Sequence, residues 1–342
     1  MISIKFGFEL TPYPDKSPLM AKKVEEAGFD SIWLSDHFLP WSHKAGSRFP
    51  FSNVTCLTHL PLFLYATSKC KVASGVICPL FRYHPAIIAQ YFAQLDYFFP
   101  NRVILGVGSG EAINELPFGY FPPVKERHER LIEAINLIRM LWEKEDYFTF
   151  EGKYYQLKNA MLYLKPQGKI EIIVSAAGPK ASKIAGKFGD GVVFLTGTPD
   201  EVENTLIPSF KRGVEEAGKN YENCERILYY AVGVVENPEL MPRVLRAMRR
   251  NIVWASLEAH KQPDPKSVDM VAEKLDEKFI MERGCFVEKV DDLIDRLEKY
   301  IKAGINYFVF VDFTAMFKGL FNEVADIWPK KIFPYFNETY KD

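Results

Sequence analysis

Strand-like and helix-like segments alternate along the whole sequence, and this alternation limits the fold more than any other feature. Continuous apolar runs of four to nine residues are typical of strands that are covered on both faces of a parallel sheet. The predicted strands are 2–8, 31–34, 71–77, 102–107, 170–174, 191–195, 227–235 and 307–311. A helical pattern follows each of them, so the chain contains eight strand–helix units. This order predicts a closed (β/α)8 barrel, an α/β TIM barrel, formed as one domain by residues 1–342.

Three stretches need a separate prediction. Residues 147–157, with Glu151-Gly152 inside, predict a small hairpin inserted before the fifth strand. Residues 254–286 contain two prolines among mixed polar residues and predict an insertion over the active-site end of the barrel. A closing helix is predicted over 316–327. An open doubly wound sheet is the main alternative fold, but it usually has fewer strands and leaves the last unit unexplained.

Composition excludes several classes of function. The formal net charge of −1 creates no long-range field that would attract nucleic acid or an anionic membrane. No apolar run approaches the roughly 18–20 residues that span a membrane. The five cysteines are odd in number and show no C-x-x-C spacing, which argues against a disulfide framework and against a structural metal site. Together with an N-terminus that has no apolar signal region, this cysteine usage favours the cytoplasm.

The loop after the second predicted strand carries the most suggestive side chains. In a TIM barrel the active face is built from the loops that follow the strands. Asp36 and His37 come directly after strand 31–34, and Trp41 follows four residues later. A carboxylate beside an imidazole suits acid–base chemistry at the barrel mouth. The same pair also suits a capped turn with an ordinary, partly buried histidine, and the stretch alone leaves both interpretations open.

Three other loops contain candidate groups. Glu9 follows the first strand. The loop Gly108-Ser109-Gly110-Glu111 lets backbone N–H groups approach a ligand and presents Glu111 without a steric shield, although a plain turn is equally compatible with it. This loop is not a dinucleotide fingerprint, because G-x-G-x-x-G is absent. Ala177-Gly178-Pro179 forms an anion seat at a helix start, or simply a helix start with proline in its first turn.

Several motifs, in the same order along the chain, resemble one known family. They are Ser35-Asp36-His37-Phe38-x-Pro40-Trp41, Phe81-Arg82-Tyr83-x-Pro85-Ala86-x-x-Ala89-Gln90, Pro100-Asn101-Arg102-Val103, Gly106-Val-Gly-Ser-Gly110-Glu111-Ala112-x-Asn114-Glu115 and Ala177-Gly178-Pro179. This set resembles the coenzyme F420-dependent branch of the luciferase-like superfamily, and within it the glucose-6-phosphate and secondary-alcohol dehydrogenases. The resemblance covers nearly the whole chain and implies the same TIM-barrel fold.

The resemblance implies a coenzyme site in the barrel mouth. Coenzyme F420, a deazaflavin, is the implied coenzyme, and FMN is an alternative on fold analogy alone. Asp36 and Cys78 are expected beside the ring, and the Gly75-Val76 bond matches the non-prolyl cis peptide that supports it in this family. The phosphate and tail are expected near Ser109 and residues 176–179. The full implied set is Asp36, Gly75, Val76, Cys78, Ser109, Glu111, Asn114, Ala176, Ala177, Gly178 and Pro179.

The resemblance also implies the chemistry of an F420-dependent dehydrogenase acting on a small molecule. His37 takes the proton of the substrate hydroxyl, for which an imidazole near its reference pKa of roughly 6.5 is suited. The carbinol carbon of an alcohol or sugar phosphate gives its hydride to C5 of the deazaflavin. Trp41 holds the substrate and favours the developing charge. Glu111 serves as the acid toward the reduced ring.

The substrate positions depart from the sugar-phosphate enzymes, in which two lysines and an arginine bind the phosphate. Arg283 matches the arginine and Lys261 matches one lysine loosely, but Thr198 stands where the other lysine is expected. The loss of one cation from a phosphate site removes a charge-assisted contact of about 1.5–3 kcal/mol. The sequence therefore puts glucose 6-phosphate in doubt.

Two other functions and one partner stay open. Gly7-Phe8-Glu9-Leu-x-Pro12 resembles methylenetetrahydromethanopterin reductase, a relative in which the early glutamate is catalytic. A non-catalytic deazaflavin- or flavin-binding protein is the third alternative, although storage requires neither a base nor an acid. The family is usually dimeric, and helix 84–98 offers Tyr91, Phe92, Tyr97 and Phe98 for a homodimer interface or, equally simply, for the core.

Overall fold

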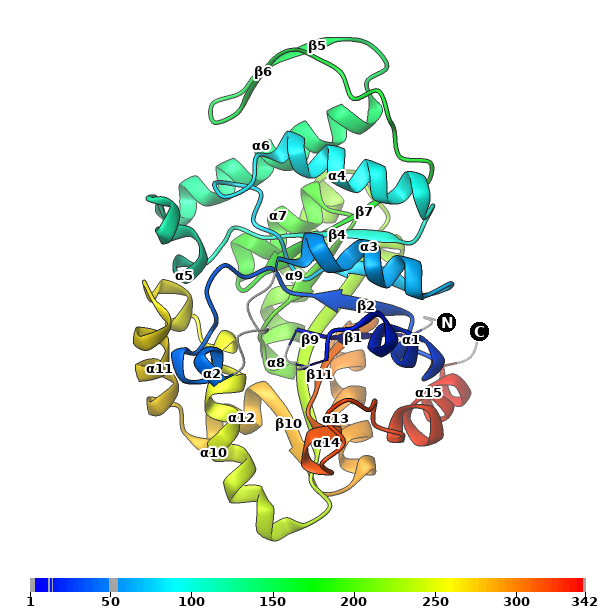
Figure 1. The fold of residues 1–342 in the computed structure, drawn as a ribbon, viewed down its shortest axis with the longest axis vertical. Coiled ribbons are helices and arrows are strands. Elements are labelled where there is room, and N and C mark those ends of the chain that lie inside the picture. The colour runs from blue at the N-terminus through cyan, green and yellow to red at the C-terminus, as the bar shows by residue number, and fades with distance from the viewer. Residues whose placement is uncertain (1–3, 12, 14, 49–54, 341–342) are drawn as a thin grey trace.

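Eight strands of the described residues form a parallel sheet that closes into a ring. Figure 1 shows these strands in the middle of the molecule, with helices around them. The computed structural model describes residues 4–11, 13, 15–48 and 55–340. In order around the ring, the strands are β1 (Lys5–Glu9), β2 (Ser31–Leu34), β3 (Lys71–Ser74), β4 (Val103–Val107), β7 (Glu171–Ala176), β8 (Gly191–Phe194), β9 (Glu225–Val234) and β11 (Tyr307–Asp312). Because β11 pairs back onto β1 in parallel, with Tyr307 opposite Lys5, the sheet has no open edge there. The predicted TIM barrel is confirmed, and the open sheet is excluded.

Alternate strand residues belong to two different core clusters. Trp33 and Ala73 pack in one cluster, whereas their neighbours Ile32, Leu34 and Val72 pack in the other. This alternation is expected for strands that bury one face inside the barrel and the other against helices. All barrel pairs are parallel, so the carboxyl ends of the strands lie at one end of the ring, where the loops that carry the candidate residues begin.

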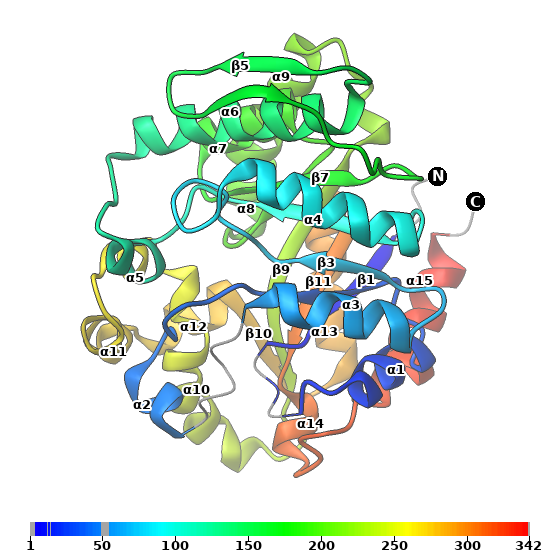
Figure 2. The ribbon, with the colours of Figure 1, turned by 45° about the horizontal axis from the view of Figure 1, so that its top comes forward.

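Helices cover the outer face of the barrel (Figures 1 and 2). Most of them follow the strand order: α1 (Pro18–Glu26), α3 (Cys56–Ala66), α4 (Pro85–Phe98), α6 (Val124–Glu143), α7 (Pro179–Phe188), α9 (Ile207–Glu216) and α13 (Val290–Lys302). Local sequence sets their ends. For example, the Ser17 side chain accepts a hydrogen bond from Met20 N at the start of α1, and Gly28, at a φ of 96°, follows its end. Among the described residues, no helix is both long and apolar enough to cross a membrane.

The predicted hairpin forms a separate two-stranded sheet. Its strands are β5 (Phe148–Glu151) and β6 (Gln156–Ala160), which pair antiparallel and lie beyond α6 at the top of Figure 1. One carboxylate of α6 holds its turn, because Glu133 accepts hydrogen bonds from the backbone N–H groups of residues 153–155 at 2.7–3.0 Å. The hairpin prediction is confirmed, with its second strand extending three residues further than expected.

Strand β9 is the longest strand and belongs to two sheet regions. Residues 225–228 pair with β8 and residues 227–232 pair with β11 inside the ring. Its last four residues, 231–234, pair with a further strand, β10 (Gly284–Val287). The segment 254–286, predicted as an insertion over the active-site end, contains α11 (Pro265–Lys274), α12 (Glu277–Arg283) and most of β10. A four-residue strand carries little local signal, and pairing with the projecting end of β9 makes it a strand.

The predicted closing helix over 316–327 is wrong. The helix α14 (Thr314–Phe317) is short, and the last full helix, α15 (Phe333–Thr339), starts later. Trp328, which follows the predicted segment, is fixed by tertiary contacts: its indole Nε1 donates to Asp312 Oδ2 at 2.7 Å, and its ring stacks on Phe310 with centroids 4.4 Å apart. These contacts hold the intervening chain as turns across the end of the barrel.

Candidate functional site

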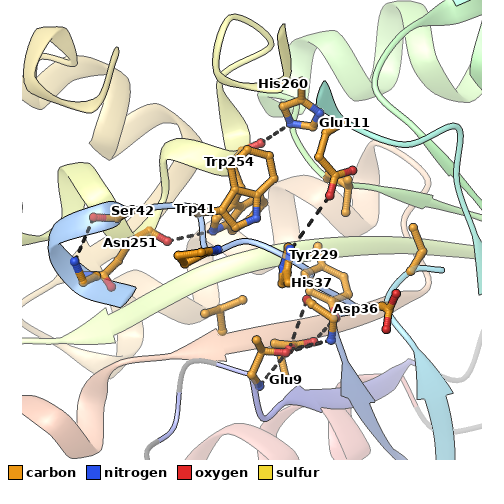
Figure 3. Close-up of a pocket in the computed structure, with 18 of the residues that line it drawn as sticks. Glu9, Asp36, His37, Trp41, Ser42, Glu111, Tyr229, Asn251, Trp254 and His260 are labelled. Atoms are coloured by element: carbon orange, nitrogen blue, oxygen red, sulfur yellow. Dashed lines mark hydrogen bonds and ion pairs between the residues drawn. The ribbon is translucent and has the colours of Figure 1, made fainter. Parts of the chain in front are cut away.

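A pocket opens at the carboxyl ends of the barrel strands (Figure 3). Its lining comes from the ends of β1, β8 and β11, the loops after β2, β3 and β4, the middle of β9, and the segment after it. The lining residues are Glu9, Thr11, Ser35, Asp36, His37, Pro40, Trp41, Ser42, Ala45, Gly75, Val76, Glu111, Leu195, Tyr229, Arg250, Asn251, Trp254, His260 and Val311. The structure thus brings seven of the predicted site residues together: Glu9, Asp36, His37, Trp41, Gly75, Val76 and Glu111.

Asp36 is fixed by residues far away in sequence. Its Oδ1 accepts a hydrogen bond from Cys56 N at 2.9 Å and from the Tyr83 hydroxyl at 3.3 Å, and its Oδ2 pairs with Arg82 Nη2 at 2.6 Å. These partners are 20 to 47 positions away, so Asp36 does not cap its own turn. The Arg82-Tyr83 motif that follows β3 therefore holds in place the carboxylate that follows β2.

Asn114 links the loop after β2 to the loop after β4. It is fully buried in the short helix α5 (Ala112–Glu115). Its Nδ2 lies 2.5 Å from Glu111 Oε1 and 3.0 Å from His37 Nδ1. Its Oδ1 accepts hydrogen bonds from the backbone N–H groups of Phe38 at 2.8 Å and Leu39 at 2.9 Å. Asn114 is therefore bound to both candidate acid–base groups at once.

His37 is neutral in this environment. Burial, together with the smaller effect of the positive charges of Arg82 and Lys16, lowers the pKa of its imidazole to about 3. Its Nδ1 lies 4.0 Å from Glu111 Oε1, but a neutral imidazole makes no ion pair there. The value near 6.5 expected from the sequence is wrong for this histidine, because a side chain only 9% exposed loses the water that would stabilise its charge.

Glu9 lies on the floor of the pocket. It is 2% exposed, and its Oε1 accepts hydrogen bonds from Thr11 N at 2.8 Å and Ser35 N at 3.2 Å. The Tyr229 hydroxyl donates to its Oε2. Burial raises the pKa of the Glu9 carboxyl, and these hydrogen bonds offset only part of that effect. Glu9 is consequently a candidate proton carrier of the pocket.

Aromatic side chains form the wall opposite Glu9. The Trp41 ring lies 5.2 Å from that of His260, and His260 Nε2 is 2.7 Å from the backbone oxygen of Trp254. Trp254 in turn contacts the Tyr229 ring edge-on, with centroids 6.4 Å apart. In the view of Figure 3, Trp41, Trp254 and His260 lie above His37, and Glu9 lies below it.

Three residues of the pocket lining are not predicted from the sequence, namely Tyr229, Trp254 and His260. Trp254 and His260 lie in the predicted insertion 254–286. The sequence predicts that this insertion contributes to the mouth of the barrel, but it does not predict which residues do so. Tyr229 lies in the middle of a buried strand, where its hydroxyl was the only available signal, since a buried tyrosine hydroxyl usually has a hydrogen-bond partner.

The Gly75–Val76 peptide bond is cis, as the family resemblance implies. Both residues line the pocket. A Cβ at position 75 would lie 2.3 Å from the Tyr229 hydroxyl, so only glycine fits against that side chain. The loop after β3 and the middle of β9 are therefore in close contact at the pocket floor.

The other implied coenzyme residues lie outside the pocket lining. Cys78 is buried, and a Cβ on Gly110 would lie 2.8 Å from its sulfur. Ser109 accepts hydrogen bonds from Arg127 Nη1 through both its backbone oxygen, at 3.1 Å, and its hydroxyl, at 3.4 Å. Residues 176–179 run from the end of β7 into the first turn of α7, where Gly178 has open space at the position of a Cβ.

The three implied phosphate-binding positions are engaged within the protein. Arg283 pairs with Glu201 through Nη1–Oε2 at 2.5 Å and Nη2–Oε1 at 3.0 Å. Thr198 caps the short helix α8 (Pro199–Glu201) through hydrogen bonds exchanged with the same Glu201. Lys261 is exposed and pairs with Glu258 at 3.0 Å. Thr198, Lys261 and Arg283 are not among the described residues that line the pocket.

A polar junction closes one side of the pocket. Asp269 of α11 accepts hydrogen bonds from the Ser42 hydroxyl at 2.6 Å and from Lys44 N at 3.1 Å. The Nε of Arg250, from α10 (Met241–Asn251), lies 3.6 Å from the same carboxylate. Ser42 directly precedes α2 (His43–Arg48) and follows Trp41, and Lys44 is the second residue of α2. The insertion is thereby bonded to the loop that carries Trp41.

Metal and disulfide chemistry have no evident support in the described part of the chain. All five cysteines are buried free thiols. Among the described residues, no group of three or more histidine, cysteine, aspartate or glutamate side chains is arranged to hold a metal ion.

Comparison with solved structures places the fold among luciferase-like enzymes. A structure titled as an F420-dependent secondary alcohol dehydrogenase in complex with an F420-acetone adduct superposes with a TM-score of 0.87 at 30% identity, over 100% of both chains. The coenzyme F420 dependent tetrahydromethanopterin reductase of Methanopyrus kandleri has a TM-score of 0.74 at 22% identity, over 98% of this chain and 99% of that one, which shows likeness of fold alone.

Sequence comparison gives the family. The F420-dependent glucose-6-phosphate dehydrogenase of Mycolicibacterium gilvum is 35% identical over 91% of this chain and 92% of its own length. The enzyme of the same name from Mycobacterium tuberculosis is 33% identical over the same shares. Residues 12–307 match the family model described as luciferase-like monooxygenase. The chain therefore belongs to the luciferase-like monooxygenase family.

Proposed function

We propose that this protein is an F420-dependent oxidoreductase that transfers a hydride between the carbinol carbon of an alcohol and C5 of the deazaflavin. The observation that carries the proposal is one pocket lined together by His37, Glu111, Trp41 and Gly75. Relatives that are 33–35% identical over about nine-tenths of the chain are named F420-dependent dehydrogenases, which supports the same coenzyme and reaction class here.

The described residues fit such a coenzyme. A flat ring needs a wall without protruding side chains, and Gly75 provides one beside Asp36 in the pocket. An anionic phosphate and tail need backbone N–H donors, and the first turn of α7 begins at Gly178, where the space of a Cβ is open. When bound, F420 supplies the carbon that accepts the hydride. Cys78, Ser109, Asn114 and residues 176–179 complete the proposed coenzyme site.

The side chains of the pocket have distinct proposed roles in the reaction. Trp41 and Trp254 enclose the substrate and exclude water from the reacting carbon. His37 binds the substrate oxygen and orients it. Glu111 exchanges a proton at its carboxylate. Asp36 is held by Arg82 and fixes the part of the loop after β2 that faces the coenzyme.

We favour an uncharged alcohol over a sugar phosphate as the substrate. A phosphate needs cations that are free to bind it, and charge-assisted contacts of this kind are worth about 1.5–3 kcal/mol each. Arg283 is instead neutralised by Glu201, and Lys261 pairs with Glu258. The Glu201 carboxylate is therefore already bound to the Arg283 guanidinium that a phosphate would need.

The test is a spectroscopic assay with purified protein and oxidised F420. Addition of a small secondary alcohol is expected to bleach the visible absorbance of the coenzyme, whereas glucose 6-phosphate at the same concentration is expected to do so much more slowly. His37→Ala is expected to bind F420 but to lose turnover. The proposal fails if F420 does not bind, or if it binds and no alcohol or sugar phosphate reduces it.

A second candidate function rests on Glu9. Its buried carboxyl with a raised pKa is suited to donate a proton, as a reductase of methylenetetrahydromethanopterin requires. Activity with that pterin and reduced F420, lost in Glu9→Gln, would favour this function. Oxidation of an alcohol without any pterin, at a rate that Glu9→Gln leaves unchanged, would favour the alcohol dehydrogenase function.

We also propose that the protein is a homodimer that works in the cytoplasm. In α4, Phe92 is fully buried, but Tyr97 and Phe98 are exposed, with 69% of Phe98 accessible. Exposed aromatic residues on one helix end suit an interface between two copies. Light scattering coupled to size-exclusion chromatography tests this, with Phe98→Glu expected to shift the mass from a dimer toward a monomer. The five free thiols are consistent with a reducing compartment.

A further inference from the structure

The orientation of the Asn114 amide is fixed by its own hydrogen bonds. Backbone N–H groups can only donate, and those of Phe38 and Leu39 both point at one amide atom of Asn114, at 2.8 and 2.9 Å. That atom must be the oxygen, so the NH2 group faces the other way. Its two hydrogens meet Glu111 Oε1 and His37 Nδ1. All the hydrogen-bonding capacity of this buried side chain is thereby used.

The amide donor decides which nitrogen of His37 carries the proton. Because Asn114 Nδ2 donates, His37 Nδ1 has to accept with its lone pair. A neutral imidazole has one N–H, which is then at Nε2. We propose that Asn114 is a positioning residue that holds His37 as the neutral Nε2–H tautomer, so that His37 presents a hydrogen-bond donor, and not a base, to the substrate oxygen. The part that concerns substrate rests on the proposed function.

The surroundings of His37 oppose a second proton. That proton could enter only at Nδ1, where it would face the N–H of Asn114. Arg82 and Lys16 add positive potential from the loop after β3 and the loop before α1, and Glu111 is the facing negative group, 4.0 Å away. The low pKa of His37, caused first by its burial, agrees with a histidine that stays neutral at all ordinary pH values.

If His37 donates, the proton of the alcohol needs another acceptor. Glu111 lines the pocket, and its Oε1 is engaged by Asn114. Its Oε2 has no hydrogen-bond partner among the described residues and is therefore available. In the proposed step the O–H bond of the alcohol breaks, its proton passes to Glu111 Oε2 and its electron pair forms the C=O bond of the product. The C–H bond breaks at the same time, and its hydrogen and electron pair would pass as a hydride to C5 of the F420 that the site would hold. A neutral histidine donor of this kind stabilises the oxygen without changing its own charge.

Nitrogen NMR tests the tautomer directly in the 342-residue protein. With 15N-labelled histidine, long-range proton–nitrogen spectra distinguish a nitrogen that bears a proton from one that does not, and His37→Gln identifies the signals of residue 37. We expect an unprotonated Nδ1 and a protonated Nε2, unchanged from pH 5 to pH 8. A protonated Nδ1, or a titration of His37 within that range, overturns the proposal.

Two variants at position 114 separate the tautomer effect from general damage. Asn114→Asp replaces the donor with an acceptor and is expected to reverse the two nitrogen signals and to raise the pKa of His37. Asn114→Leu keeps the bulk without either group and is expected to give a mixture of tautomers. If Asn114 were merely structural, both variants would lower stability alike and leave the Nε2–H signals in place. These readouts need no coenzyme, so they stand even if the proposed activity fails.

Kinetics provide the second readout, once an alcohol substrate is in hand. Glutamine keeps an N–H donor but cannot act as a base, so His37→Gln is expected to retain roughly tenfold more turnover than His37→Ala, the worth of one hydrogen bond. Equal losses in the two variants contradict the donor role. Glu111→Gln is expected to lower kcat by roughly 100-fold or more, as removal of a proton acceptor does. Full activity of Glu111→Gln excludes it as the acceptor.

Discussion

Single residues behind the pocket show how burial adjusts charge. Glu115 is fully buried, and neither of its carboxylate oxygens has a hydrogen-bond partner among the described residues. Burial raises the pKa of this carboxyl to about 7, and the negative charge of Glu111, one helical turn earlier, adds to the rise. Glu115 is thus close to half-protonated at neutral pH, beside a carboxylate that lines the site.

The first prediction concerns the pH dependence of stability. In the folded protein Glu115 keeps its proton up to about pH 7, whereas in the unfolded chain it loses it near 4.5. The folded state therefore binds more protons between these values, so this group lowers the free energy of unfolding as pH rises through that window. Glu115→Gln removes the effect and is expected to be more stable than the wild type at pH 8 by roughly 3 kcal/mol, with no such gain at pH 4.5.

Urea unfolding at both pH values measures this difference. Glu145→Gln, at an exposed position after α6, is the control for replacing a carboxylate by an amide on the surface. An equal effect of Glu115→Gln at pH 4.5 and pH 8 would contradict a raised pKa.

At this scale the sequence predicted positions better than environments. Asp36, His37 and Glu111 follow predicted strands, so their place at the barrel mouth could be inferred from chain order. The pKa of His37 could not, because it depends on burial and on Arg82 and Lys16, which come from two other loops. The role of Asn114 was also out of reach, since it depends on which of its amide atoms faces which loop.

At the scale of elements, local signals predicted the strands and the tertiary structure decided the ends of the chain. The four residues of β2 were predicted with the observed bounds, because a short apolar run between turns is a strong signal. The segment 316–327 has helical spacing, but only its two ends are helical. The conformation of this segment depends on the buried hydrogen bond from Trp328 to Asp312, which no local sequence pattern predicts.

The second prediction tests that bond. Trp328→Phe keeps an aromatic ring on Phe310 but leaves Asp312 Oδ2, which is fully buried, without its donor. An unsatisfied buried acceptor costs about 1–3 kcal/mol, more for a charged group, so the free energy of unfolding is expected to fall by at least that amount. Trp142→Phe is the matched control, since its indole donates to the backbone oxygen of Ala89 in a partly buried place. Equal losses in the two variants, measured by urea unfolding, would show that the Asp312 bond has no special weight.

At the scale of the whole molecule, the pocket joins parts of the chain that lie far apart in sequence. Asp269 bonds to Ser42 and Lys44 across 227 and 225 positions, and Arg250 reaches the same carboxylate. Figure 1 shows α2 beside α11 and α10 at one side of the barrel. The loop that carries Trp41 is therefore held by the insertion.

The third prediction follows from this junction. Asp269→Ala removes the acceptor of the Ser42 hydroxyl and of Lys44 N, so the wall beside Trp41 should loosen. We expect a higher KM for the alcohol with F420 affinity nearly unchanged. We also expect a loss of about 2–4 kcal/mol in stability, from one buried and one partly buried hydrogen bond to a charged group. Glu273→Gln is the control: its ion pairs with Lys44 and Arg250 are exposed and should contribute little. An unaltered KM in Asp269→Ala would show that the junction does not shape the substrate wall.

The double pairing of β9 has a consequence for how such a pocket diversifies. Residues 225–232 of this strand pair with their neighbours in the ring, and residues 231–234 pair with β10, at the end of the insertion. The insertion is hydrogen-bonded through β10 to β9, which is a strand of the barrel. Replacing the whole insertion with that of a relative would therefore disturb the barrel. We therefore expect substrate range to drift in small steps, through exchanges at positions such as Trp254 and His260, while the frame that carries them is inherited intact.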